Sequence, residues 1–366
     1  MNKYLRLALL LLLISCNSNK GKVLHPEGDL VSLQVEEDNN PEIYVESLFD
    51  SVQFIPVQNS QLIGAIDLLA VKDDSLFLAG DTKFTQSLFL INSKGQIVNS
   101  YKYAGRGPQQ GLYLQDIKYD SFGDNFIALL QNPGKLIFFD DSLRVRNVLT
   151  FSNDFFRFIP AASRFYLYAH NDQKIFQLRR GSEKAEEFFD LDSMDYYPFN
   201  PTPVFQPGFY FNVPYSPVVY KIEQGALNPI VELEYIPIST EQETETLLKK
   251  YPPVIQNIYE SGEYLIIFFT YMYLTRAIIY PGVQGAAVSQ GIFMDKHGIT
   301  GSLFSQKDNC IYGTITSDRF VSFYNSYKNY AFTGDFPRII FKGNVQGVKT
   351  ESNPMLVKYY LKDSLN

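Results

Sequence analysis

The sequence predicts an all-β protein, a six-bladed β-propeller, and a long internal period is the main reason. A turn cluster followed by a short aromatic or aliphatic strand occurs six times, with spacings of 50, 39, 44, 55 and 46 residues between equivalent positions. One four-stranded propeller blade takes about 40–50 residues. A β-sandwich is the alternative, but its turns recur every ~8–12 residues without this longer period. The equivalent positions are Leu76, Phe126, Phe165, Phe209, Tyr264 and Cys310.

Composition supports the same class. Aromatic residues are 15% of the 366 residues, with 19 Pro and 23 Gly, which favours short strands joined by tight turns. Within five of the repeats a second apolar run follows about ten to fourteen residues later, as expected for a meander. These runs are residues 88–91, 136–139, 175–176, 218–220 and 277–279.

The sixth repeat lacks an outer strand. After the strand at Cys310 the chain makes an excursion over residues 317–353 and then enters a last strand at 355–361. We predict that residues 52–57 supply the missing strand, because an open ring would leave unpaired edges at both ends. The N-terminal and C-terminal strands would then close the propeller, and Pro56 favours an edge position.

Residues 1–15 are expected to be a signal peptide. Lys3 and Arg6 precede an apolar run over 7–14, which is too short to span a bilayer. The segment before Cys16 resembles the lipobox of bacterial lipoproteins, which predicts lipidation of Cys16 and a membrane partner through that lipid. The alternative is an ordinary secretory peptide that happens to contain a Cys. Asn17 favours the outer membrane, by resemblance to sorted lipoproteins.

The rest of the chain divides into a tether and one domain. Residues 16–45 are polar and acidic and are predicted to be a flexible tether. The propeller is expected over 46–362, with insertions at 239–250 and 317–353. The first insertion carries a Ser/Thr cap, early Glu and late Lys, a helix signature.

Charge and cysteine content exclude some classes. The formal net charge is −7 and falls to −9 once Lys3 and Arg6 are removed. No Lys/Arg-rich cluster remains, so we expect no nucleic-acid partner. Cys310 is the only other cysteine, so with Cys16 acylated no intramolecular disulfide can form, and a buried apolar role is expected for Cys310.

A glycine-rich bend, GRGPQQGLY, lies between the first and second blades. Gly tolerates positive φ and Pro fixes φ, so Gly105, Gly107, Pro108 and Gly111 predict a compact turn. Such residues are more often turn formers than ligand contacts.

That bend resembles the Gly-x-Gly-Pro-Gly-Glu-Tyr segment of the six-bladed β-propeller lipoproteins of Bacteroidetes, an NHL-like family. The segments LFDSVQFIPVQ and ESNPMLVKYYLK are also similar to that family, and the likeness covers about residues 46–362. It implies a propeller fold and a cell-envelope address, with no assigned biochemical role. Gln109 and Gln110 replace the usual Gly-Glu, so a role tied to that Glu does not carry over.

One rim of the ring is the expected binding surface. If each blade runs from its inner strand A to its outer strand D, the B–C and D–A loops share one rim, and loops on a rigid scaffold usually carry binding residues. The excursion over 317–353 would join them. The candidates on this rim are Asp81, Lys83, Arg106, Gln109, Asn132, His170, Asn171, Asp172, Tyr215, Tyr271, Tyr273, Arg276, Asp295 and His297.

Each candidate has a structural alternative. Arg106 offers a planar five-donor fork, but it could pair with a structural carboxylate instead. Tyr271 and Tyr273 could stack on a sugar or peptide, or pack in the core as most tyrosines do. The Asp295-Lys-His-Gly298 cluster could serve acid–base chemistry, or be a solvated turn.

Enzyme signatures are few. The sequence has no G-x-S-x-G, H-E-x-x-H or P-loop motif, and its three His residues (His25, His170 and His297) show no metal-ligand spacing. We expect no catalytic residue and no cofactor. Calcium in the channel is the alternative, and it would need convergent carboxylates and carbonyls.

The sequence therefore predicts a non-catalytic binding module of the cell envelope. Its partner would be an extracellular glycan, a peptide or an outer-membrane protein. A propeller-type hydrolase or lyase with its site at the channel mouth is the alternative. A structural subunit of a larger complex is a third interpretation.

Overall fold

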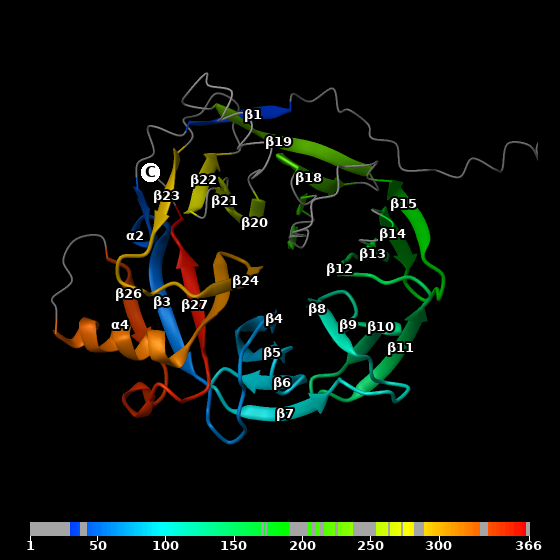
Figure 1. Cartoon of the computed structure of the whole chain (residues 1–366), viewed down its shortest axis with the longest axis horizontal. Coiled ribbons are helices and arrows are strands. Elements are labelled where there is room, and N and C mark those ends of the chain that lie inside the picture. Colours follow the sequence, from blue (N-terminus) through cyan, green and yellow to red (C-terminus); the bar gives the residue numbers. More distant parts are fainter. Residues whose placement is uncertain are drawn as a thin grey trace, which may run out of the picture.

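A computed structural model shows a ring of radial sheets (Figure 1). It describes residues 30–36, 42–169, 172, 174–190, 204–206, 210–212, 216–223, 226–236, 254–262, 264–271, 274–281, 289–329 and 336–363. In these residues six sheets surround a central channel, and the first strand of each blade lies innermost. The all-β, six-bladed β-propeller predicted from the sequence is confirmed.

Blades 1 to 3 are four-stranded antiparallel meanders. Blade 1 has β4 (Leu68–Lys72), β5 (Leu76–Asp81), β6 (Ser87–Asn92) and β7 (Ile97–Lys102). Blade 2 has β8 (Tyr113–Asp120), β9 (Asn125–Gln131), β10 (Gly134–Phe139) and β11 (Val145–Phe151). Blade 3 has β12 (Arg157–Pro160), β13 (Arg164–Ala169), β14 (Lys174–Arg179) and β15 (Glu186–Asp190). A short 3₁₀ helix, η1 (Asp73–Ser75), joins β4 to β5.

Blades 4 to 6 each carry a fifth strand on the outside. Blade 4 has β16 (Val204–Gln206), β17 (Tyr210–Asn212), β18 (Val218–Glu223) and β19 (Ala226–Ile236), with β1 (Val31–Glu36) beyond. Blade 5 has β20 (Val254–Ser261), β21 (Tyr264–Tyr271), β22 (Leu274–Pro281) and β23 (Ser289–Met294), with β2 (Glu42–Tyr44) beyond. Blade 6 has β24 (Ser302–Lys307), β25 (Cys310–Ile315), β27 (Met355–Leu361) and β3 (Phe49–Pro56), with β26 (Arg338–Phe341) beyond.

The repeats found in the sequence fall on the second strands. Leu76, Tyr264 and Cys310 begin β5, β21 and β25, and Phe126 and Phe165 are the second residues of β9 and β13. Phe209 and the helix expected over 239–250 lie outside the described residues. The apolar runs at 88–91, 136–139, 175–176, 218–220 and 277–279 lie in the third strands.

Each interface between neighbouring blades has its own apolar core, which explains why the second strands are continuously apolar. In β9, Phe126 and Ala128 pack toward blade 1, whereas Ile127 and Leu129 pack toward blade 3. Successive side chains of a strand point to opposite faces, so a strand buried on both sides needs no polar residue. The described residues form six such clusters. Cys310 is buried in the one between blades 6 and 1.

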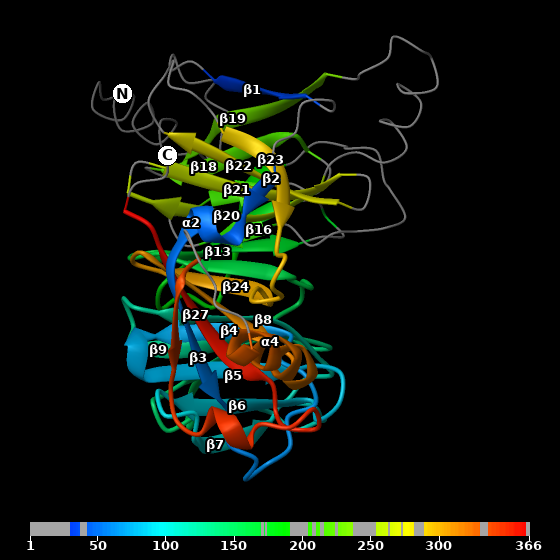
Figure 2. The same cartoon turned by 90° about the vertical axis from the view of Figure 1, so that its left-hand side faces the viewer.

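The two chain ends meet in blade 6. β3 pairs antiparallel with β27, and Phe54 lies opposite Val357. Figure 2 shows the two strands side by side. The predicted closure is confirmed, with one difference: β3 is not the outermost strand, because β26 pairs parallel with its residues 51–54. Pro56 lies beyond β26, so its missing N–H costs no hydrogen bond on that side.

A buried asparagine also links the segments next to β3 and β27 through hydrogen bonds. Asn353, which precedes β27, is 1% exposed. Its Nδ2 donates to the carbonyl oxygens of Gln58 and Gln61 at 2.9 and 2.7 Å, and its Oδ1 accepts from Ile63 N at 2.8 Å. The loop that leaves β3 is therefore held by the segment that enters β27.

Residues expected to be part of the tether instead run along the outside of the ring. β1 pairs parallel with β19 and β2 with β23, before the helix α2 (Val45–Leu48) leads into β3. We name the described part of residues 30–56, which comprises β1, β2, α2 and β3, the belt. Leu33 and Val35 of β1 are buried between blades 4 and 5, whereas Ser32 and Gln34 are exposed.

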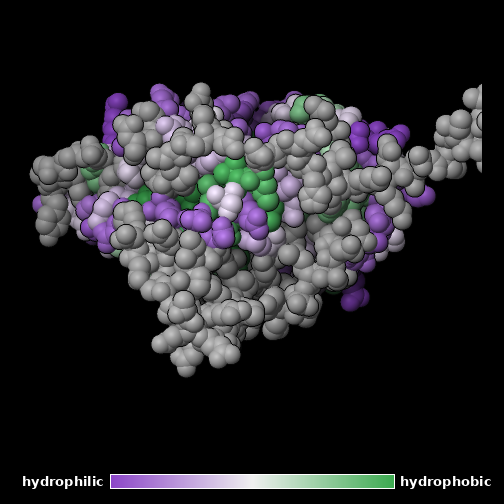
Figure 3. Space-filling view, turned by 90° about the horizontal axis from the view of Figure 1, so that it is seen from above, coloured by the Kyte–Doolittle hydropathy of each residue, from purple (hydrophilic) through white to green (hydrophobic). Residues whose placement is uncertain are grey.

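The expectation of a flexible tether over 16–45 therefore differs from the structure at 31–36 and 42–44. Val31, Leu33 and Val35 alternate with polar residues, a pattern that indicates a half-buried strand. The acidic residues that follow directly make the segment look like a tether. On the edge of the ring that carries β1 and β19, hydrophilic residues surround a smaller hydrophobic area of the described surface (Figure 3).

The excursion over 317–353 contains the helix α4 (Ser317–Asn329), then β26 and the 3₁₀ helix η2 (Val345–Gly347). Phe320, Phe323, Tyr324 and Tyr327 recur at helical spacing and form one aromatic face. Phe320 and Phe323 pack on Phe54 at ring-centroid distances of 5.2 and 5.3 Å. The helix therefore covers the strand that closes the ring (Figure 2).

Phe54→Ala tests this packing. The side chain is fully buried and contacts three other rings, so its truncation is expected to lower the free energy of unfolding by about 3–5 kcal/mol. Phe122→Ala is the matched control, because Phe122 is 56% exposed, and it should cost less than about 1 kcal/mol. Urea unfolding followed by tyrosine fluorescence measures both. Equal losses for the two variants would contradict the packing described.

Candidate functional site

The topology gives the ring two different rims. The loop rim consists of the B–C and D–A loops, and the turn rim consists of the A–B and C–D turns. The described part of the loop rim is 57–67, 82–86, 103–112, 132–133, 152–156, 172, 216–217, 295–301, the start of α4 and 342–354. The described part of the turn rim is 73–75, 93–96, 121–124, 140–144, 161–163, 180–185, 262 and 308–309.

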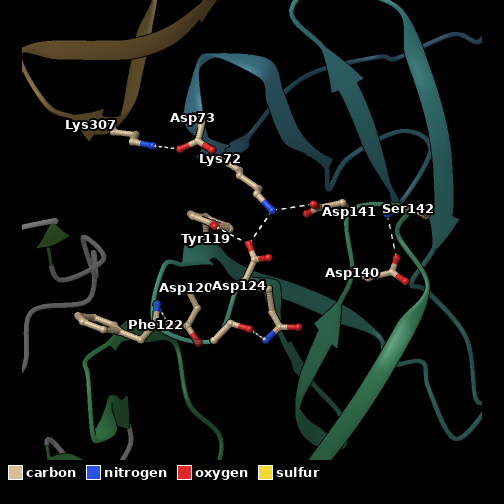
Figure 4. Close-up of polar contacts among 12 residues, drawn as sticks. Lys72, Asp73, Tyr119, Asp120, Phe122, Asp124, Asp140, Asp141, Ser142 and Lys307 are labelled. Carbon is tan, nitrogen blue, oxygen red and sulfur yellow. Dashed lines mark hydrogen bonds and ion pairs between the residues drawn. The ribbon is translucent and has the colours of Figure 1, made fainter.

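Ion pairs join neighbouring blades along the turn rim (Figure 4). Lys72 at the end of β4 reaches both Asp124 and Asp141 of blade 2, at 2.6 Å each. The other pairs join blade 6 to blade 1 and blade 3 to blade 2. They are Lys307–Asp73, Lys358–Asp74 and Arg180–Asp120.

The pKa values of this network reflect the pairing. Burial acts to lower the pKa of Lys72, but hydrogen bonds to Asp124 and Asp141 raise it above its ordinary value. Burial likewise opposes ionisation of Asp74, yet hydrogen bonds from Lys358 and Tyr312 hold its pKa below the usual range. Lys72 and Asp74 therefore stay charged at neutral pH, and the ion pairs of the turn rim stabilise the contacts between blades.

Sequence reasoning missed these pairs. Asp73, Asp74 and Asp124 belong to the turn clusters of the first two repeats, and a turn pattern alone does not show which charges meet between blades. A Lys-Asp dipeptide ends the inner strands of both blade 1 (Lys72-Asp73) and blade 6 (Lys307-Asp308), and this repetition was the available signal.

No group of three His, Cys, Asp or Glu side chains is placed to hold a metal ion among the described residues. The expectation of no cofactor, and the calcium alternative, both stay predictions.

On the loop rim, the Gly105–Gly111 bend is organised around a buried lysine. Lys135 of β10 is 5% exposed, and its Nζ donates to the carbonyl oxygens of Gly107, Pro108 and Gln110 at 3.2, 2.9 and 2.7 Å. Burial lowers the pKa of Lys135. The side chain of Gln110 folds under the bend, accepting from Gly107 N at 3.1 Å and donating to Lys102 O at 3.2 Å.

The glycines of the bend leave room for Gln110. A Cβ at Gly105 would overlap the Gln110 amide, and one at Gly107 would lie 2.9 Å from its Oε1. Arg106 between them is exposed, and no described residue hydrogen-bonds or ion-pairs with its guanidinium. Gln109 is also exposed, and its carbonyl oxygen accepts from the Tyr101 hydroxyl. The bend therefore presents Arg106 outward from a fixed loop.

Asp81, by contrast, is buried and stabilises two loops of the loop rim by accepting hydrogen bonds from their backbone amides. It is fully buried, with Oδ1 accepting from Phe84 N at 2.9 Å and Oδ2 accepting from Gly64 N at 2.9 Å. Burial opposes its ionisation, but these backbone hydrogen bonds hold its pKa below the usual range. Lys83 pairs with Asp67 at 3.2 Å.

The remaining candidates are scattered around the rim. Asn132 is exposed in the B–C turn of blade 2 with φ 54°, and Asp172 accepts from Asn153 Nδ2 at 3.3 Å in blade 3. Tyr271 ends β21. Cys16, His170, Asn171, Tyr215 and Tyr273 lie outside the described residues.

The structure separates Arg276 from Asp295. On β22, Ala277 and Ile279 pack toward blade 6, whereas Ile278 and Tyr280 pack toward blade 4. Arg276 has the parity of Ile278, so it belongs to the blade 4 side, where it is 5% exposed.

Asp295 orders the loop between blades 5 and 6. Its Oδ1 accepts from Ile299 N at 2.9 Å, and its Oδ2 accepts from Thr300 N and from Arg319 NH2, both at 2.8 Å. The Thr300 hydroxyl also donates to Oδ2. His297, two residues on, is exposed and packs edge-on against Phe336 at 5.1 Å between ring centroids.

A cleft opens beside this loop, between blades 5 and 6. Its volume is about 490 Å³. Phe268, Phe293 and Leu303, which belong to or pack on the apolar core below, form its apolar part. The polar lining comes from blade 5, the loop, β24 and α4, namely Gln256, Asn257, Thr275, Asp295, Thr300, Ser302 and Arg319.

Exposed apolar side chains also gather on the loop rim. Eight large ones are exposed among the described residues, and five of them lie in or next to loop-rim loops. These five are Leu62, Phe84, Leu112, Tyr113 and Leu274. Scattered single residues need no explanation, but concentration on one rim is typical of an interaction surface.

A ring of six radial sheets with its chain ends paired in one blade defines a six-bladed β-propeller. The chain belongs to the DUF5128 family, described as a 6-bladed beta-propeller, whose model matches residues 26–282. This confirms the family resemblance drawn from the sequence.

Solved structures agree with the fold. A protein of Bacteroides fragilis assigned as exported is 12% identical, with a TM-score of 0.66 over 91% of this chain and 100% of its own. A DUF4221 member from Bacteroides vulgatus is 7% identical, with a TM-score of 0.53 over 87% and 98% of the two chains. A streptogramin B lyase is 11% identical, with a TM-score of 0.47 over 86% and 98%, so its activity carries no argument here. No curated protein sequence matches the chain.

Lys135→Met tests the organisation of the Gly105–Gly111 bend. Removing the ammonium leaves three carbonyl oxygens without their donor, so the bend should loosen and trypsin should cleave after Arg106 severalfold faster than in the native protein. Lys94→Met, at an exposed lysine of the turn rim, is the matched control and should leave this rate unchanged. Mass spectrometry of the fragments measures it. An unchanged cleavage rate in Lys135→Met would show that the lysine does not hold the bend.

Proposed function

We propose that the protein is a lipid-anchored module of the cell envelope whose loop rim binds an extracellular ligand without converting it. The ligand is a glycan, a peptide or an outer-membrane partner protein. The observation that carries this proposal is the concentration of exposed apolar side chains on the loop rim, next to a 490 Å³ cleft. The turn rim offers much less, because its charged side chains are largely paired between blades.

The chemistry of the loop rim favours binding over catalysis. Asp295, the carboxylate expected to serve acid–base work, already accepts hydrogen bonds from two backbone amides, one hydroxyl and one guanidinium. These four donors occupy the roughly four lone-pair sites of the two carboxylate oxygens, so the carboxylate is already engaged in holding the loop. Asp295 therefore acts as a fastening.

The envelope address is supported by the N-terminal sequence. Lys3, Arg6, the apolar run and Cys16 have the order of a lipoprotein leader. The assignment of the similar B. fragilis protein as exported agrees with that address. No helix in the described part of the chain is long and apolar enough to cross a membrane.

A pair of double variants tests the binding surface. Phe84→Ala with Tyr113→Ala removes two exposed aromatic residues of the loop rim, and Val98→Ala with Phe122→Ala removes two exposed apolar residues elsewhere. Aromatic anchors dominate most binding energies, so the first pair should weaken capture about tenfold or more and the second less than about twofold. Capture is measured on immobilised neutral polysaccharides, acidic polysaccharides, peptides and outer-membrane protein fractions.

The same experiment separates binding from catalysis. The wild-type protein should retain its ligand and release no product, as checked by chromatography of the supernatant. Product release would favour the hydrolase or lyase alternative. Equal capture by the two double variants, or no capture from any probe, would contradict the proposal.

A further inference from the structure

The cleft between blades 5 and 6 has the dimensions and the two-part lining of a small-ligand site. Pockets for small ligands are about 300–1,000 Å³, and this one is about 490 Å³. Phe268 and Phe293 meet edge to face at 5.0 Å and give it an apolar wall. The remaining lining is mostly uncharged, with hydroxyl and amide groups.

One cation stands in the lining, and its position is fixed. Arg319 NH2 donates to Asp295 Oδ2 at 2.8 Å, and Asp295 is itself held by Ile299 N and Thr300 N. A guanidinium has five N–H donors, and Asp295 is its only acceptor among the described residues. The side chain is 47% exposed. Arg319 therefore keeps a pre-oriented fork available to an incoming anion.

A carboxylate matches that fork. Arginine recognises planar carboxylates through two parallel N–H···O bonds, which adds geometric specificity to the charge. Asp295 balances the charge of Arg319, so the lining as a whole is near neutral. A ligand with one carboxylate and several neutral polar groups fits it better than a polyanion does.

The neutral polar groups point to a sugar rather than an extended peptide. Gln256, Thr275 and Ser302 offer side-chain polar groups, and the aromatic wall suits the C–H face of a pyranose ring. One common mode of binding extended peptides adds a strand to a free sheet edge. In the five-stranded sheets of blades 5 and 6 the free edges are those of β20 and β24, which face the channel, and those of β2 and β26, which lie on the outside of the ring (Figure 1).

We infer that this cleft binds a sugar residue that carries a carboxylate, a uronic acid, with Arg319 holding the carboxylate. The inference rests on the proposed binding function and names the ligand chemistry of one part of the loop rim. The aromatic wall of the cleft packs against the pyranose ring. The side-chain amides and hydroxyls of the lining form hydrogen bonds with the sugar hydroxyls.

Titration calorimetry with defined probes tests the inference on the full mature chain. Tri-galacturonate should bind about tenfold or more tightly than the neutral match galactotriose, and its affinity should fall with added salt. Arg319→Ala should abolish this preference, Arg319→Lys should keep part of it, and Arg338→Ala should leave it unchanged. Arg338 is an exposed arginine on β26, away from the cleft lining.

A second variant protects the test against misfolding. If Arg319→Ala lowers the melting temperature, Thr275→Phe serves instead: Thr275 lines the cleft but makes no hydrogen bond to Arg319 or Asp295, and the larger side chain should abolish binding of both trisaccharides. Tri-glutamate serves as the peptide probe, and affinity equal to that of tri-galacturonate would overturn the assignment to a sugar. Equal affinity for acidic and neutral trisaccharides, no binding of either, or full tri-galacturonate affinity in folded Arg319→Ala would also overturn it.

The two proposals can fail separately. If tri-galacturonate fails but capture still depends on Phe84 and Tyr113, the uronic acid inference falls and the binding function stands. If capture depends on neither loop-rim residue, the binding function itself falls.

Discussion

The antiparallel pairing of β3 with β27 is the constraint on which the rest of the structure depends. A propeller is a ring of sheets that contact only their neighbours, so without closure two sheet edges and two apolar faces would be left open. Here β3, which precedes the four strands of blade 1 in the chain, supplies the fourth strand of blade 6, with Phe54 opposite Val357. Asn353 and the aromatic face of α4 fasten the same junction from either side. Closure is thus shared by backbone pairing, a buried amide and aromatic packing.

Closure by the chain ends also makes the ring asymmetric. The belt adds outer strands to blades 4 and 5 before it reaches blade 6, whereas blades 1 to 3 keep four strands. The two rims differ as well: ion pairs between blades occupy much of the turn rim, and the loop rim carries the cleft and most exposed apolar side chains. The turn rim stabilises the ring, and the loops of the other rim can vary in sequence without disturbing those ion pairs.

How much of this could be predicted from the sequence follows from the range of each interaction. The fold can be predicted because the buried second strands repeat at blade length. The closure can be predicted because the sixth repeat lacks one strand. The contacts of the site cannot be predicted in this way, because they join residues far apart in sequence. Asp295 and Arg319 are separated by an entire strand pair, and nothing in their local pattern indicates that they meet. The sequence gives no sign of which face of β22 carries Arg276, since a shift of one residue in register decides which neighbouring blade a side chain meets.

The central claim, that β3 and β27 from opposite ends of the chain form one sheet, is tested most directly by hydrogen exchange. Mass spectrometry of the protein should find the amides of β3 and β27 protected to the same degree, and in rising urea both should lose protection in one transition. Rapid exchange of residues 49–56 alongside lasting protection of residues 355–361 would contradict the account.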